Sequence, residues 1–341
     1  NQTVSYNVYV PYEQLAKVEI FNTKAAINIA NNTTNITSWD RESKDAVTTI
    51  IDNKHNLNFI YTNSNYVYIQ RLNENMGVRD TLKIQKRYPI YGDTIVDDDG
   101  NYYIAWGQND TSPESTGKIT FVISKYSNSG SYISSYEKTD SPKPVEKPPA
   151  TGEQEEIRKE EPTKTIFANG TCNLDINSKG IIAYNYAKET KAGLQCNSSG
   201  YIDSNTMKEA KDYKVYPYAA HSWATDVIAL SNGDFAFLQQ TDMQKRSYDV
   251  SLITQNVDKK YTEYNRQMFH FREGLAKQAG YYYTFSNYGS IEDLKTGVAL
   301  IASSEKTLSL SPAGSTENES RNVFMQILKN RKIRLPTYRI L

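Results

Sequence analysis

Residues 93–105 read Asp93-Thr94-Ile95-Val96-Asp97-Asp98-Asp99-Gly100-Asn101-Tyr102-Tyr103-Ile104-Ala105, and this stretch decides the fold. Two short apolar runs flank a polar segment that ends in Gly100. Glycine adopts a positive φ at little cost, and tight turns between strands require that conformation. The stretch therefore predicts a β-hairpin.

The same pattern recurs along the chain. Each copy has a short strand, a turn that ends in glycine and a second apolar strand, and the further copies begin at Asn173, Asp226 and Glu273. The turn glycines lie at positions 100, 180, 233 and 280, and the first gap contains a polar insert. A fainter copy around Ala46–Asp52 turns through residues 53–56. A repeat of about 50 residues with about four strands per unit is typical of propeller blades.

Apolar runs elsewhere are short and alternate with polar residues, as in Val4–Val10 and Tyr66–Ile69. Such runs indicate strands, and helical periodicity is nearly absent from the 341 residues. We therefore predict an all-β protein, a single β-propeller of about six or seven four-stranded blades over residues 1–341. Residues 139–164, rich in Pro, Glu and Lys, are expected to form an insert or linker between blades.

One blade carries a family resemblance. Val96–Ile104, followed by Phe121–Gly130, resembles the repeat of secreted bacterial β-propellers, in which "D-x-D-G-N-hydrophobic" starts a blade and "F-hydrophobic-x-K-Y" with a later glycine ends it. The resemblance covers residues 90–136, and the other units match in pattern rather than in letters. It implies a propeller fold and an extracellular setting. It implies no activity, because propellers host many functions.

Several features agree with an extracellular or cell-surface location. Cys172 and Cys196 are the two cysteines, and extracellular cysteines usually pair, so we expect a disulfide between them. A chain that begins at Asn1 rather than Met fits removal of a signal peptide, although an arbitrary starting point would look the same. Candidate glycosylation sites in N-x-[ST] motifs are Asn1, Asn31, Asn32, Asn35, Asn109, Asn169, Asn197 and Asn318.

Charge and composition argue against several classes of function. The 39 basic residues balance 39 acidic ones, whereas a nucleic-acid partner calls for a cationic surplus. No apolar run reaches the roughly 20 residues of a membrane-spanning helix. The three histidines do not lie at metal-ligand spacings, so we expect neither a metal nor a cofactor.

Aligning the units on their turn glycines suggests a site. Asp93, Asn173, Asp226 and Glu273 then lie seven residues before glycine, at one mouth of the central channel. His221, Trp223 and Arg272 are expected beside them. Such a ring could bind a cation or a sugar, and crowding should raise the pKa of at least one carboxyl. The alternative is a hydrated polar channel with no ligand.

No catalytic motif stands out, so we favour a non-enzymatic extracellular interaction or structural protein, such as a subunit of a surface assembly or filament. Its partners would be other copies of itself or another surface protein. Two alternatives remain open: a carbohydrate-binding propeller, and a propeller glycosidase or lyase that uses Asp93, Asp226 and Glu273. Trp106 and Phe237 are expected in the core between blades.

Overall fold

The computed structural model describes twelve stretches of the chain. They are residues 47–110 (without 53, 74 and 76), 118–140, 163–167, 170–190, 195–210, 225–240, 248–255, 264–271, 287–293, 297–305, 321–329 and 337–340. The regular secondary structure within them is β-strand. None of these residues forms a helix with the length and hydropathy of a membrane span.

The strands form five antiparallel sheets that follow one another along the chain. Sheet 1 contains β1 (Val47–Ile51), β2 (Leu57–Thr62), β3 (Tyr66–Leu72) and β4 (Val78–Gln85). Sheet 2 contains β5 (Ile90–Val96), β6 (Tyr102–Gln108), β7 (Ile119–Tyr126) and β8 (Tyr132–Asp140). Sheet 3 contains β9 (Thr163–Ile166), β10 (Cys172–Ile176), β11 (Ile181–Thr190), β12 (Gln195–Asp203) and β13 (Lys208–Glu209). Sheet 4 contains β14 (Thr225–Ala229), β15 (Phe235–Gln240), β16 (Tyr248–Gln255) and β17 (Tyr264–Phe271). Sheet 5 contains β18 (Asn287–Asp293), β19 (Gly297–Glu305), β20 (Arg321–Lys329) and β21 (Thr337–Ile340).

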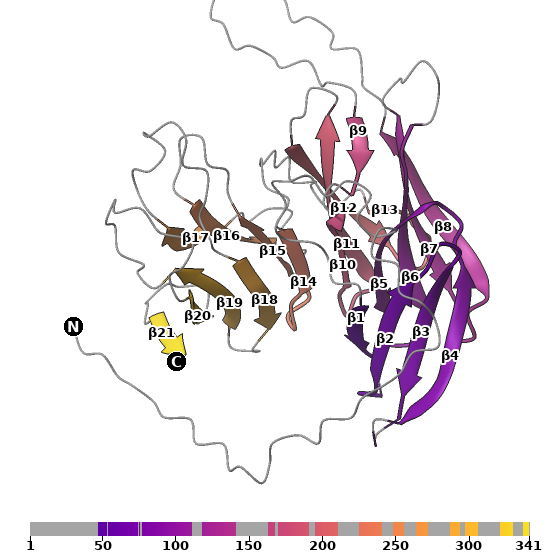
Figure 1. Ribbon diagram of the computed structural model, residues 1–341, viewed down its shortest axis with the longest axis horizontal. Helices are drawn as coiled ribbons and strands as arrows, with labels where there is room; N and C mark the ends of the chain where they lie inside the picture. The colour runs from indigo at the N-terminus through magenta and orange to yellow at the C-terminus, as the bar shows by residue number, and fades with distance from the viewer. Residues whose placement is uncertain are drawn as a thin grey trace, which may run out of the picture.

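The sheets are the blades of a propeller. Their strands pair in sequence order, apart from β9, which pairs with β11 beside β10. The first strands of consecutive sheets contact one another, from β1 through β5, β10 and β14 to β18. Figure 1 shows these first strands near the centre and the last strands β4, β8 and β17 at the periphery. The chain is therefore an all-β propeller, as predicted.

The described residues hold five sheets, fewer than the six or seven blades expected for the whole chain. Residues 1–46 lie outside the described residues. Most of the polar insert does so as well: β8 ends at Asp140 and β9 begins at Thr163.

Apolar side chains fill the spaces between neighbouring sheets. Trp106 is fully buried between sheets 1 and 2, with its ring 6.4 Å from that of Tyr91. Phe237 is buried between sheets 3 and 4, where Tyr201 packs against it at 6.1 Å. Both predicted core positions are thus confirmed. Alternating side chains on a strand point to opposite faces, so each sheet contributes to two such cores.

An aromatic ring and two glycines join sheets 2 and 3. Phe167, which follows β9, is fully buried and has a positive φ of 53°. A Cβ at Gly92 or Gly107 would lie 2.9 Å from its ring, so the two glycines make the space that the ring occupies. Asn109 holds the same segment, because its Oδ1 accepts the N–H of Ile166 at 2.8 Å.

Candidate functional site

The first hairpins of sheets 2, 3 and 4 share one geometry. Gly100, Gly180 and Gly233 have φ values of 82°, 74° and 83°. In each hairpin the residue four before the glycine pairs with the residue two after it, as Val96 pairs with Tyr102. The turns of these three units therefore align on their glycines, and Asp93, Asn173 and Asp226 lie on consecutive first strands, but only Asn173 and Asp226 are paired in the same way across their hairpins.

A β-bulge directs Asp93 toward sheet 3. The register of β5 and β6 shifts between Tyr91 and Thr94, which leaves Gly92 and Asp93 as the bulged residues. The Oδ2 atom of Asp93 accepts the N–H of Leu174 in β10 at 2.8 Å. A first strand is the inner edge of its sheet, where main-chain groups lack a ladder partner. Asp93 satisfies one of those groups across the gap between two sheets.

Two side chains of β10 make the same kind of contact with β14. The Nδ2 atom of Asn173 donates to the main-chain oxygen of Thr225 at 2.6 Å. The Oδ2 atom of Asp175 accepts the N–H of Ala229 at 2.6 Å. Asn173 and Asp175 are two residues apart on one strand, so they point to the same face. We call the contacts of Asp93, Asn173 and Asp175 the inter-sheet clamps.

Asp175 has the perturbed carboxyl of this group. Burial raises the pKa of Asp175 to about 6, and the nearby charge of Asp93 adds to the shift, although main-chain N–H bonds oppose it. Asp175 was not among the candidates, and its pKa is raised chiefly by burial rather than by the crowding of carboxylates that the sequence predicted. Asp175 could have been found from the sequence, because it lies two residues after Asn173 and alternate residues of a strand share a face.

Of the other predicted site residues, the structure describes Asp226 alone. Asp226 lies half-buried in β14, where its Oδ1 accepts the N–H of Val227 at 2.8 Å. His221, Trp223, Arg272 and Glu273 lie outside the described residues. The unit assigned around Gly280 lies between β17 and β18, outside the described residues, and among the described strands the next first hairpin after β14 and β15 is β18–β19. Sheet 4 is completed by β16 and β17.

The acidic run Asp97–Asp99 forms a turn. Asp97 Oδ1 accepts the N–H groups of Asp99 and Asn101 at 3.0 and 2.8 Å, and its Oδ2 accepts the hydroxyl of Tyr103 at 2.9 Å. Asp97 thus stabilises the predicted hairpin, because its carboxylate binds the N–H groups of the turn. In the part of the chain that the structure describes, His, Cys, Asp and Glu do not gather in groups that could hold a metal.

The predicted disulfide does not agree with the register of sheet 3. Cys172 of β10 pairs with Tyr186, and Cys196 of β12 pairs with Lys188, so β11 lies between the two cysteines. Two strand spacings separate their Cα atoms by about 10 Å, beyond the roughly 7 Å that a disulfide can span. Cys172 is instead buried in the core between sheets 2 and 3.

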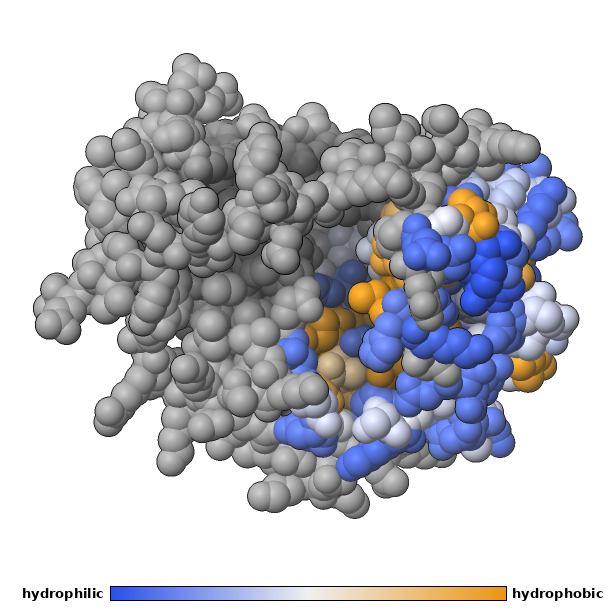
Figure 2. All heavy atoms as spheres, turned by 90° about the horizontal axis from the view of Figure 1, so that it is seen from below, coloured by the Kyte–Doolittle hydropathy of each residue, from blue (hydrophilic) through white to orange (hydrophobic). Residues whose placement is uncertain are grey.

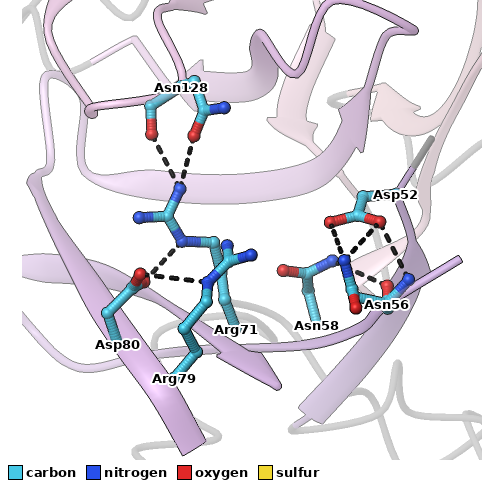
Figure 3. Close-up of polar contacts among 7 residues, drawn as sticks. All are labelled: Asp52, Asn56, Asn58, Arg71, Arg79, Asp80 and Asn128. Carbon is cyan, nitrogen blue, oxygen red and sulfur yellow. Dashed lines mark hydrogen bonds and ion pairs between the residues drawn. The ribbon is translucent and has the colours of Figure 1, made fainter. Parts of the chain in front are cut away.

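Polar contacts also join sheets 1 and 2 near the β7–β8 turn (Figure 3). Arg71 donates from Nε to Asp80 and from Nη1 to the main-chain oxygen and Oδ1 of Asn128 in the β7–β8 turn. Arg79 contacts the same Asp80 at 3.2 Å. The guanidinium of Arg71 therefore bridges two sheets while its charge is balanced by Asp80.

The faint first repeat has the same turn with a different residue in the glycine position. Asp52 Oδ1 accepts the N–H groups of Lys54 and Asn56 at 2.9 and 2.8 Å. Burial acts to raise the pKa of Asp52, but these bonds outweigh it and the pKa is lowered. His55 adopts a φ of 60°, where the other units have glycine, which explains why the repeat was faint in the sequence.

Among the candidate glycosylation sites, Asn109 and Asn197 are half-buried in the described part. The other six, namely Asn1, Asn31, Asn32, Asn35, Asn169 and Asn318, lie outside it.

Comparison with known proteins gives no family. No family model and no curated protein matches the chain. Similar solved structures include a lignostilbene dioxygenase of Pseudomonas brassicacearum, with 8% identity over 84% of this chain and 61% of that one and a TM-score of 0.41. An α-L-arabinanase of Penicillium chrysogenum complexed with arabinobiose has 11% identity over 84% and 77%, with a TM-score of 0.41. A sialidase of Streptococcus pneumoniae has 13% identity over 72% and 33%, with a TM-score of 0.31. The chain thus spans less than two thirds of the dioxygenase, and the propeller assignment rests on its own sheet topology.

Proposed function

We propose that the protein is a non-enzymatic, extracellular interaction module whose partner is a protein, with a second copy of the chain as the first partner to test. The observation that carries this proposal is an exposed aromatic side chain held in one orientation. Tyr132, at the start of the outermost strand of sheet 2, is 45% exposed, and the adjacent Ile133 is 49% exposed. Exposed apolar side chains that lie together are typical of interaction sites.

The surroundings of Tyr132 fix its ring. The guanidinium carbon of Arg87 lies 3.9 Å from the ring centroid, and the ring of Tyr126 meets it edge-on at 5.9 Å. Ile133 is the extra residue where the register of β7 and β8 shifts, and a bulge re-aims such a side chain. We call Arg87, Tyr132 and Ile133 the rim patch. Tyrosine and arginine are enriched in protein interfaces, and a fixed side chain loses little entropy on binding.

The surface around such groups is polar. Figure 2 shows a largely hydrophilic described surface from below, with hydrophobic residues in small groups, some of them at the outer rim. A small apolar patch with a polar border fits a weak or reversible contact better than a permanent one. The sequons and the resemblance to secreted propellers support the extracellular setting.

Sedimentation velocity of the full chain tests this proposal. Wild type should self-associate with a Kd of about 10 µM or tighter, and the Y132S/I133S double variant should weaken that association at least about tenfold. T139S, at an exposed position near the other end of β8, is the matched control and should leave association unchanged. A wild-type protein that stays monomeric at about 100 µM would rule out the second copy as the partner.

Glycoside hydrolysis is the second candidate, and one observation favours it. Burial raises the pKa of Asp175 to about 6, so this carboxyl could donate a proton near neutral pH if a substrate displaced the main-chain N–H groups that its two oxygens accept. If the protein hydrolyses a polysaccharide, D175N should abolish turnover while a glycan array still detects binding. Binding without turnover by wild type would instead favour the carbohydrate-binding alternative.

A further inference from the structure

The rim patch lies in a basic stretch of the chain. Residues 82–88 contain two lysines, Arg87 and no acidic residue. Arg87 is exposed, and its contact with the Tyr132 ring holds the guanidinium in place without neutralising its charge. Within the described part of the chain, Arg87 makes no ion pair with a carboxylate. The patch therefore offers an unneutralised positive charge beside exposed apolar surface.

Lys86, the residue before Arg87, adds a second cation of this kind. Its Nζ atom is buried and has no hydrogen-bond partner among the described residues. Burial lowers the pKa of Lys86 to about 8, so most of the amine is still protonated at pH 7. A buried ammonium without an anion is costly, and a carboxylate brought close to it would reduce that cost. Two neighbouring residues thus favour an acidic partner.

The chain itself carries an acidic group of the matching kind. The β5–β6 turn has Asp98 and Asp99, both exposed, at its tip. The bonds of Asp97 to N–H groups of the turn and the positive φ of Gly100 define the shape of this turn. A turn with a defined shape loses little entropy when it docks on a partner.

The acidic turn and the rim patch lie at the same end of sheet 2. The β5–β6 and β7–β8 turns are neighbours there, since a Cβ at Gly100 would lie 2.9 Å from Nδ2 of Asn128. Tyr132 lies in one row across the sheet with Tyr126 and Tyr102, next to these turns. Two strand spacings, about 10 Å, separate β6 from β8, more than the roughly 4 Å of an ion pair. Because both groups lie at one end, a twofold axis beside that end can place the turn of each copy on the rim patch of the other.

We propose that two copies of the chain form a twofold dimer in which the β5–β6 turn of each copy docks on the rim patch of the other, with Asp99 facing Arg87. This inference rests on the proposed function and names the surface that the rim patch binds. Such a contact closes on itself, so association should stop at the dimer. Each dimer contains the ion pair twice, so any substitution in the pair acts twice.

Charge reversal tests this docking, with sedimentation velocity of the full chain as the measurement. R87E and D99K should each weaken self-association at least about tenfold, because each sets like charges against one another at both contacts. K118E makes the same charge change as R87E at an exposed site just before β7, at the end of sheet 2 opposite the two turns, and should leave association unchanged. Raising NaCl from about 0.05 to about 0.5 M should also weaken the wild-type dimer.

Mixing the two variants, one of them fluorescently labelled, separates a direct pair from an indirect effect. R87E and D99K should form a mixed dimer with a Kd within about threefold of wild type, because the reversed charges face each other at one contact and the native pair is intact at the other. A mixture that stays monomeric, while wild type associates and Y132S/I133S does not, would overturn this docking and leave the proposed function standing. A wild type that is monomeric at about 100 µM would overturn both, and wild-type species larger than a dimer would overturn the twofold arrangement.

Discussion

Asp175 makes stability depend on pH. Its pKa rises from 3.8 to about 6 on folding, chiefly because the carboxyl is buried. Between these values the folded protein binds more protons than the unfolded chain, so the contribution of Asp175 to stability falls as pH rises. The full effect is at most about 3 kcal/mol, lost between about pH 4 and pH 7.

Urea unfolding of wild type and D175N over this pH range measures the effect. The free energy of unfolding of wild type relative to D175N should decrease as pH rises, because the variant lacks the titrating group. Taking the difference removes the contribution of Asp52, whose lowered pKa acts in the opposite direction. A difference that is the same at all pH values would show that Asp175 does not titrate in this range.

At the scale of elements, the segment formed by β9 and Phe167 depends on two glycines. A Cβ at Gly107 would lie 2.8 Å from Cγ2 of Ile166 and 2.9 Å from the ring of Phe167. Both neighbours are fully buried, so G107A should lower the free energy of unfolding by about 1–3 kcal/mol. Denaturant unfolding measures the loss, and the smaller F167L side chain should recover part of it in the double variant.

G77A is the matched control for that substitution. The Cβ it adds would meet the side chain of Asn73 at 3.2 Å, and this side chain is exposed rather than packed in a core, although its Oδ1 also accepts the N–H of Gly77 at 2.9 Å, so the expected loss is smaller. Equal losses in G77A and G107A would mean that glycine entropy, rather than the space for Phe167, decides the effect.

Most of the hairpins could be predicted from the sequence, whereas the strand register and the contacts between neighbouring sheets could not. The turns at Gly100, Gly180 and Gly233 can be recognised in the sequence, because glycine is the residue that adopts the left-handed backbone conformation readily. His55 adopts that region without glycine and so concealed a repeat. The bulge that aims Asp93 at sheet 3, and the register that separates Cys172 from Cys196, depend on strand pairing that local patterns do not encode.

At the scale of the whole molecule, shared cores couple the sheets. Tyr91, Tyr184 and Tyr201 lie in three successive cores, between sheets 1 and 2, 2 and 3, and 3 and 4. No sheet in this described series can lose its packing without exposing a face of the next. We therefore expect sheets 1 to 4 to unfold in one cooperative transition.

Two truncations at opposite ends of this series test the coupling. W106A should cost about 3–5 kcal/mol, and F237A a similar amount, because each empties a buried site. In differential scanning calorimetry, both variants should move a single transition to lower temperature. If W106A instead splits the transition in two, sheets 1 and 2 unfold independently of sheets 3 and 4.

The inter-sheet clamps have a consequence for how such a chain can change over time. Asp93 and Asp175 each bind a main-chain N–H, and the side chain of the residue that offers it takes no part in the bond, whereas Asn173 binds the main-chain oxygen of Thr225 and also its hydroxyl. A substitution of Leu174 or Ala229 keeps the donor of the bond unless it introduces proline, which has no N–H, although the buried core still restricts position 174 to apolar residues. The sequences of neighbouring blades can diverge, and blades can be duplicated or exchanged, while the hydrogen bonds between them are kept. This freedom explains repeats that agree in pattern but hardly in letters.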